Sequence, residues 1–160
     1  MGTCCQVTFD ETCRPIHNVQ RGPAGRGTDR LTRHDPWCDA YNKLWDPPGL
    51  IVETEVSTTE HWDYDGSLVT TFGPIDYGEI HDPLWGLVAK AFTPYSYTVP
   101  SSSVTMGKWA AKWQIDGGAY QHIQSITPTV YGTGGCTAIM ELTGVTPGNS
   151  YPEFTIVVHP

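Results

Sequence analysis

Charged residues are scarce in this chain, and arginine is absent after Arg33. Only 16% of the 160 residues are charged, and the net charge is −8. Residues 35–160 carry four lysines and fourteen carboxylates, whereas all the arginines lie near the N-terminus: Arg14, Arg21, Arg26, Arg30 and Arg33. Because phosphate neutralisation needs clustered Lys and Arg, this distribution argues against a body that binds nucleic acid.

Long apolar runs are missing too. No stretch reaches the roughly 20 residues of a membrane-spanning helix, and the N-terminus lacks the apolar core of a signal peptide. We therefore expect no membrane insertion and see no export signal. The location that we expect is a virion or another extracellular particle, because a virion protein released by lysis needs no leader.

Catalytic motifs are absent as well. There is no HExxH or GxSxG pattern, and the GPAGRG run lacks the Lys-Ser/Thr of a phosphate loop. Some carboxylates could form a glycosidase pair, but an acidic solvated face explains them better: Glu53, Glu55, Glu60, Asp63 and Asp65. The histidines His61, His81 and His122 lack a supporting motif. We expect no enzyme, no catalytic residue and no cofactor.

An odd number of cysteines rules out a monomer in which all of them pair. Four of the five, Cys4, Cys5, Cys13 and Cys38, lie in the N-terminal quarter, and the fifth is Cys136. In an oxidising compartment two disulfides would leave one thiol free or intermolecular; the alternative is buried thiols. His17 and His34 could join the N-terminal cysteines as zinc ligands, but the spacing of the cysteines matches no familiar zinc-binding motif. We expect no metal site.

The chain divides into two regions. Residues 1–49 are rich in Gly, Pro, Arg, Asp and His and show no period, which predicts an irregular arm with one short helical turn at Pro36–Leu44. Residues 50–160 predict one β-domain, with short strands between turn sequences such as DYDG, DGG and GTGG. The predicted strands are Leu50–Val56, Ser67–Phe72, Gly86–Phe92, Tyr95–Val99, Lys108–Ile115, Tyr120–Gln124, Thr127–Tyr131, Thr137–Thr143 and Glu153–Val158.

Alternation is clearest near the C-terminus. Cys136, Ala138, Met140 and Leu142 form a first set of alternating residues that would face the core. A second such set follows at Phe154, Ile156 and Val158. Strands with one apolar and one polar face are typical of antiparallel sheets. The fold class predicted is therefore mostly β, an antiparallel β-sandwich preceded by the extended arm.

A short segment, residues 142–151, resembles the fibronectin type III and immunoglobulin-like sandwiches. The run Leu142-Thr-Gly-Val-Thr-Pro147-Gly148-Asn-Ser-Tyr151 is similar to the corner between strands E and F of that family. The resemblance implies that the Tyr151 hydroxyl bonds to the nearby backbone and pins the corner. Pro152 shifts the alternation, and no closing strand follows. A different topology, coverage by the chain's own arm, or a strand donated by another copy would each protect the open edge.

Aromatic residues supply the candidate binding surface. Trp62 and Tyr64 alternate on one predicted strand, Trp109 and Trp113 share another, and Tyr95 and Tyr97 share a third. When exposed, such rows stack on sugar rings or fill a protein interface, whereas buried rows are simply core.

The arginines of the arm also have two interpretations, a solvated loop or a contact with the acidic body of a neighbouring copy.

The function that we expect is a non-enzymatic structural protein that packs into a particle or filament, most concretely a bacteriophage virion component such as a capsid decoration, neck, tail or fibre protein. Its partners would be copies of itself or neighbouring structural proteins. The alternative is an extracellular carbohydrate-binding module with glycan partners.

Overall fold

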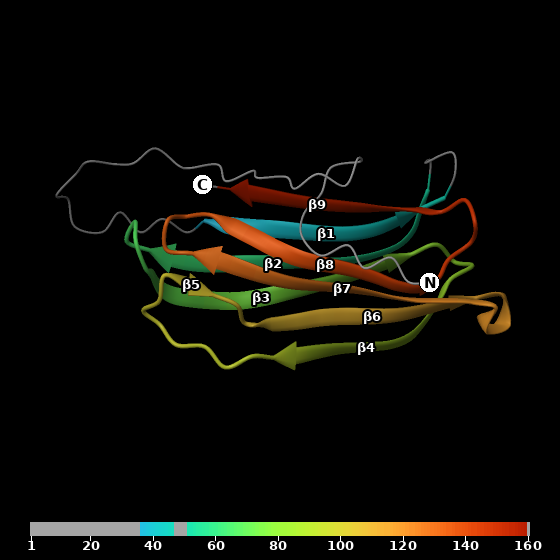
Figure 1. Cartoon of the computed structure of the whole chain (residues 1–160), viewed down its shortest axis with the longest axis horizontal. Coiled ribbons are helices and arrows are strands. Elements are labelled where there is room, and N and C mark those ends of the chain that lie inside the picture. The colour runs from blue at the N-terminus through green and yellow to red at the C-terminus, as the bar shows by residue number, and fades with distance from the viewer. Residues whose placement is uncertain (1–35, 47–50, 160) are drawn as a thin grey trace.

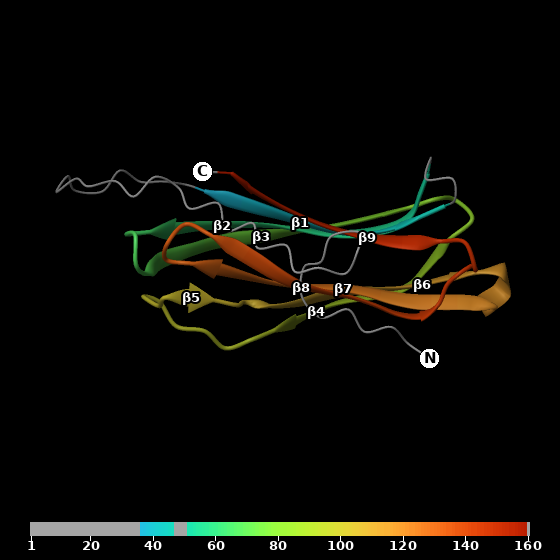
Figure 2. The same ribbon diagram turned by 45° about the horizontal axis from the view of Figure 1, so that its top comes forward.

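The computed structural model describes residues 36–46 and 51–159, which form two antiparallel sheets without an α-helix. The first sheet has the order β3-β2-β1-β9, with β1 at Trp37–Trp45, β2 at Val52–Tyr64, β3 at Val69–His81 and β9 at Tyr151–His159. The second sheet has the order β4-β6-β7, and both β8 and the short β5 pair with β7. Its strands are β4 at Gly86–Pro94, β5 at Ser103–Val104, β6 at Gly107–Ile115, β7 at Tyr120–Tyr131 and β8 at Cys136–Val145. Figures 1 and 2 show the sheets as two stacked layers. None of the described helical segments could span a membrane.

The strands follow chain order around the molecule. The chain passes from β1 through β3 to β4, then through β8 and back to β9, which pairs with β1. In immunoglobulin-like sandwiches the first and last strands lie in different sheets, whereas β1 and β9 are neighbours here. The β-sandwich prediction is therefore confirmed, and a different topology accounts for the absent closing strand.

Turn residues join the strands as their chemistry predicts. In the β2–β3 hairpin the Asp65 carboxylate accepts hydrogen bonds from the backbone N–H groups of Ser67 and Leu68, at 2.9 and 2.8 Å. Gly66 adopts a φ of 96°, which glycine tolerates without a steric penalty. The DYDG sequence is thus a hairpin turn, as the sequence predicts. A one-turn 3-10 segment, Asp116–Gly118, joins β6 to β7.

The predicted boundary between arm and domain is wrong in one respect. Pro36–Leu44 does not form a helical turn, because Trp37–Trp45 is β1, a central strand of the first sheet. The sandwich therefore begins inside the range 1–49 that was assigned to the arm. The earlier residues, 1–35, lie outside the described part of the chain.

Other strand predictions need correction as well. Tyr95–Val99 is not a strand, and the two strands predicted at 120–131 are one continuous strand, β7. Pro128 is tolerated inside β7 because the pairing with β6 stops at Ile126 and the pairing with β5 starts at Val130. On this side of β7 no strand pairs with Pro128. The N–H group that proline lacks is therefore not needed for a ladder hydrogen bond there.

The core lies between the inner faces of the two sheets. One cluster contains three tryptophans, Trp85, Trp109 and Trp113, and the second surrounds Trp62 at the other end. The predicted inward alternation of β8 is confirmed, because Cys136, Ala138 and Met140 are buried and Leu142 is partly buried against the core.

A disulfide joins the two sheets. Cys38 of β1 and Cys136 of β8 are bonded, with 6.3 Å between their Cα atoms and 98 residues between them in sequence. Closing so long a loop removes much conformational freedom from the unfolded chain. The other three cysteines lie outside the described residues.

We expect the Cys38→Ala/Cys136→Ala variant to lose about 3–5 kcal/mol of unfolding free energy, as is typical for a bridge that closes a loop of this length. Urea unfolding in air-saturated buffer with EDTA measures the loss. With a reductant present, wild type and variant should unfold within about 1 kcal/mol of each other, because neither then has the bridge. An undiminished difference under reduction would mean that lost packing, rather than the bridge, is responsible.

Candidate interaction surfaces

The outer face of the first sheet is acidic. Side chains of directly paired residues point to the same side of a sheet. Because Cys38, Ala40 and Leu44 face the core, the residues between them and their partners face outward. Lys43 is the only Lys or Arg in these four strands, and it shares this face with several carboxylates: Asp39, Glu55, Asp63, Asp76 and Glu153. We call this surface the acidic face.

Three aromatic residues of β1 also point outward. Trp37, Tyr41 and Trp45, which we call the β1 aromatic row, alternate with the buried residues of this strand. The Lys43 ammonium lies 5.1 Å from the centre of the Tyr41 ring and 5.8 Å from that of Trp45. Trp37 stacks on His159 with 4.4 Å between ring centres. Neighbouring side chains therefore already contact these ring faces, so the row is not an open platform for sugar rings.

The outer face of the second sheet has a different character. It carries two lysines and one carboxylate among small, hydroxyl-bearing and aliphatic side chains, and we call it the lysine face: Lys108, Ala110, Lys112, Ile123, Ser125, Thr127, Ile139, Glu141 and Thr143. Ile123 and Ile139 are 42% and 44% exposed. The lysine face therefore combines exposed apolar surface with positive charge.

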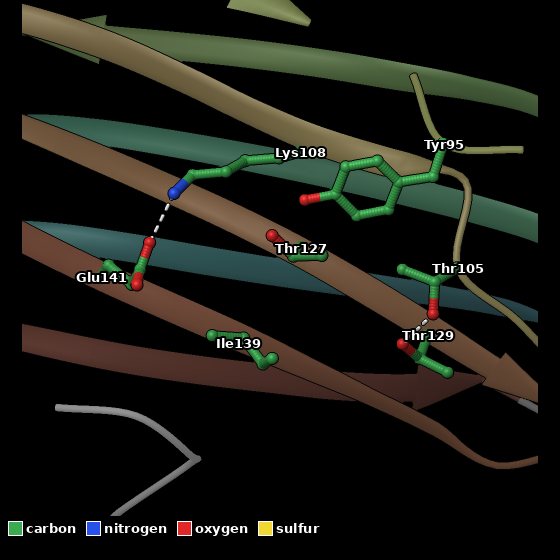
Figure 3. A pocket seen from close by; sticks show the side chains of 7 residues that line it. All are labelled: Tyr95, Thr105, Lys108, Thr127, Thr129, Ile139 and Glu141. Carbon is green, nitrogen blue, oxygen red and sulfur yellow. Dashed lines mark hydrogen bonds and ion pairs between the residues drawn. The ribbon is translucent and has the colours of Figure 1, made fainter. Parts of the chain in front are cut away.

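A shallow hollow of about 460 Å³ lies on the lysine face. It is lined by Tyr95, Thr105, Lys108, Thr127, Thr129, Ile139 and Glu141, and we call it the Tyr95 hollow. Figure 3 shows Lys108 and Glu141 pointing toward one another, as the ion pair between them requires. The hydroxyls of Thr105 and Thr129 are 2.6 Å apart. The hollow therefore offers a charged pair, several hydroxyls and a tyrosine ring.

A buried polar layer holds the two sheets in register. The Asn42 side-chain amide donates to the backbone oxygens of Ser125 and Glu141, at 3.1 and 2.9 Å. Gln124 in turn donates to the backbone oxygens of Asn42 and Thr54, at 3.0 and 3.3 Å. Because each bond joins β1 or β2 to β7 or β8, the layer fixes how the sheets face each other.

Two titratable side chains are buried between the sheets. His122 shares a hydrogen bond of 2.9 Å with the Thr54 hydroxyl and packs edge-on against Trp85. Burial lowers the pKa of His122 to about 4, so the ring is neutral at pH 7. At the other end of the core, burial raises the pKa of Glu60 to about 8.

The structure assigns the predicted aromatic residues mainly to packing. Trp62, Trp109 and Trp113 are at most 7% exposed, so they form core, which is one of the two interpretations that the sequence left open. Tyr64 is half-buried against the cluster that contains Trp62. Tyr95 and Tyr97 remain 42% and 43% exposed.

The predicted tyrosine corner does not form. Pro147 and Gly148 lie in the turn between β8 and β9, where the Ser150 N–H donates to the Pro147 oxygen. Tyr151 begins β9 opposite Trp45 and is 45% exposed. No residue in the described ranges forms a hydrogen bond with its hydroxyl. The side chain belongs to the surface of the first sheet, because its register with β1 directs it outward.

The candidate acid–base residues are not brought together. Glu60 faces the core, whereas Glu55 and Asp63 on the same strand face outward. His61 lies on the acidic face and His122 between the sheets. Asp65 caps the hairpin and Glu53 lies near the start of β2. The candidate residues are therefore divided among the core, the acidic face and the turn of the hairpin.

The β1 aromatic row is the main surface feature that the sequence prediction missed. Its signal is the alternation of large and polar residues in WCDAYNKLW, which has the period of a strand. The five arginines proposed as contacts, Arg14, Arg21, Arg26, Arg30 and Arg33, lie outside the described residues. Comparisons with protein-family models, curated proteins and solved structures found no match.

We expect the His122→Gln variant to change how stability depends on pH. The folded pKa of about 4 lies below the usual value near 6.5, so the unfolded chain binds more protons between these values. The stability due to neutral His122 is complete above pH 6.5 and falls by about 3 kcal/mol as the pH drops to 4.

Urea unfolding of both proteins at pH 7 and pH 4.5 tests this expectation. The advantage of wild type over the variant should shrink or reverse at the lower pH. Glu60 is present in both proteins, so its opposite contribution cancels in the difference. An advantage that is equal at the two pH values would show that His122 does not titrate as its burial implies.

Proposed function

We propose that this chain is a non-enzymatic structural protein that assembles with copies of itself or with neighbouring proteins. The observation that carries the proposal is the opposite charge of its two outer faces. Asp39, Asp76 and Glu153 lie on the acidic face, whereas Lys108 and Lys112 lie on the lysine face. Two such faces on opposite sides of a flat sandwich favour contacts in which one copy stacks on the next.

The geometry of such a contact determines the kind of assembly. A contact between two different faces is head-to-tail, and it generates a ring when the rotation closes or a filament when it does not. The exposed Ile123 and Ile139 supply apolar surface, and the charges supply orientation. The arginine-bearing arm would add a further positive segment able to reach the acidic face of a neighbour.

The most concrete form of this function is a bacteriophage virion component, such as a capsid decoration, neck, tail or fibre protein. A sandwich tied by a disulfide and by polar bonds between its sheets is a rigid unit suited to repeated packing. Its outer surfaces, rather than a cleft, carry the distinguishing chemistry. Virion packing would place the protein in an extracellular particle.

We expect the Lys112→Glu variant to associate about tenfold more weakly than wild type, a difference of about 1.4 kcal/mol. Light scattering of the full chain across a concentration series, at low and high salt, measures this. Wild-type association should also weaken as salt rises, because exposed charges are screened.

Two further variants sharpen this test. Ala119→Glu adds negative charge at the end of the β6–β7 turn, away from both faces, and should associate like wild type. Adding Asp76→Lys to Lys112→Glu restores opposite charges and should recover part of the loss. A wild-type chain that stays monomeric at every concentration and salt would refute assembly driven by this chain alone.

The Tyr95 hollow favours a second candidate, an extracellular carbohydrate-binding module. A partly exposed tyrosine beside hydroxyls and an ion pair could stack on one sugar ring and bind its hydroxyls. The β1 aromatic row gives this candidate less support, because its ring faces contact neighbouring side chains.

If the hollow binds sugars, Tyr95→Ala should lower glycan affinity by about tenfold or more, because it removes the stacking ring. Glycan arrays followed by calorimetry on any positive glycan measure the effect. Tyr151→Ala, on the opposite face, is the matched control and should leave binding unchanged. A wild-type protein that binds no glycan on the array would refute this candidate.

A further inference from the structure

A carboxylate lies beside the disulfide inside the core. Glu60 of β2 is directly paired with Cys38 of β1, and Cys136 reaches the same point from β8 in the opposite sheet. The two sulfur atoms and a carboxylate oxygen of Glu60 all lie within 4.8 Å of one another. Three side chains with metal-binding atoms therefore converge between the sheets.

Glu60 differs from the other buried polar side chains. It is 0% exposed, and no group of the opposite sheet in the described ranges pairs with its carboxyl oxygens, whose polar neighbour is the Thr58 hydroxyl of the same strand. Asn42 and Gln124, by contrast, donate to the opposite sheet. Burying an unpaired carboxyl group is unfavourable, and native structures usually satisfy such groups. A buried carboxyl group without a partner on the opposite sheet, beside two sulfurs, points to a ligand that is bound in another state of the site.

We propose that the reduced form of this site binds one thiophilic divalent cation of the Zn²⁺ type through Cys38, Cys136 and Glu60. Zn²⁺ prefers tetrahedral sites with thiolate sulfur at about 2.3 Å and carboxylate oxygen at about 2.0–2.2 Å. Such geometry separates two sulfurs by roughly 3.8 Å, so the opened bridge needs only a small movement of the two side chains. Cys38, Glu60 and Cys136 are the only cluster of potential metal ligands in the described ranges, and it holds three residues. Water would therefore supply the fourth ligand.

The reaction balances without an unnamed participant. A dithiol or phosphine reductant transfers two electrons, and with two protons the disulfide becomes two thiols. The cation then displaces both thiol protons and the proton of the buried Glu60 carboxyl group, and it binds the two thiolates and the carboxylate. Because the same sulfurs serve both states, the disulfide and the metal site exclude each other. Either state ties β1 to β8, the disulfide in an oxidising compartment and the cation in a reducing one.

Cobalt spectroscopy tests the proposal. The protein is the full-length Cys4→Ser/Cys5→Ser/Cys13→Ser variant, which removes the N-terminal thiols as competing ligands. After reduction with a phosphine, Co²⁺ should bind with one ion per chain and give the visible bands of tetrahedral Co²⁺ and a near-ultraviolet thiolate charge-transfer band. Zn²⁺ should displace it. The oxidised protein should show neither band.

Glu60→Gln in the same background tests the third ligand. The variant keeps the size of the side chain and both thiols, so the charge-transfer band should persist while Co²⁺ affinity falls more than about tenfold, since loss of an outer-sphere partner alone costs about 10–100-fold. Cys136→Ser should abolish the charge-transfer bands of a two-thiolate site. Circular dichroism checks that each variant is folded.

A thermal measurement keeps the proposal testable if a variant does not fold. Zn²⁺ should raise the melting temperature of the reduced protein with its three site residues intact, whereas Mg²⁺, which prefers oxygen ligands, should not. Failure of the reduced protein to bind Co²⁺, or equal affinity in Glu60→Gln, would overturn the proposal. An equal thermal shift with Mg²⁺ would do so as well.

Discussion

The fold depends on how two sheets bury polar side chains between them. Asn42, Thr54, His122 and Gln124 all face the opposite sheet, where unpaired polar groups would each cost about 1–3 kcal/mol. Their hydrogen bonds run from one sheet to the other and have direction, whereas the packing of the tryptophans does not. The polar layer thus sets the relative position of the sheets, and with it the meeting of Cys38 with Cys136.

The choice of residues that face the core also determines which residues lie on the outer faces of the two sheets. In a strand each residue that faces the core is followed by one that faces outward. The inward alternation of Cys38, Ala40 and Leu44 therefore directs Asp39 and Lys43 to the surface of the first sheet. The same rule directs Lys108 and Lys112 outward, because Trp109 and Trp113 fill the core. The opposite charges of the two faces follow from the packing.

The sequence was most informative where alternation was simple. Cys136, Ala138 and Met140 predicted the inward face of β8, and DYDG predicted the hairpin between β2 and β3. In β1 the same period was hidden, because both sets of positions mix polar and apolar residues. Asn42 is polar but buried, and Trp37 is aromatic but faces outward, so the sequence of Pro36–Leu44 suggested a short helical turn instead of a strand. Long-range features were out of reach: a local pattern cannot pair Cys38 with a residue 98 positions away, or place Glu60 beside them.

The acidic face has a physical consequence for an assembling protein. Glu55 and Glu153 lie on either side of Lys43 and repel each other, so like charge within this face destabilises the isolated sandwich by a small amount. A positively charged surface on a partner removes that repulsion while it gains attraction. Salt therefore acts in opposite directions on the two processes, because screening relieves repulsion within one chain and weakens attraction between chains. If the chain assembles as proposed, its folding should therefore become more stable as salt rises while its association becomes weaker.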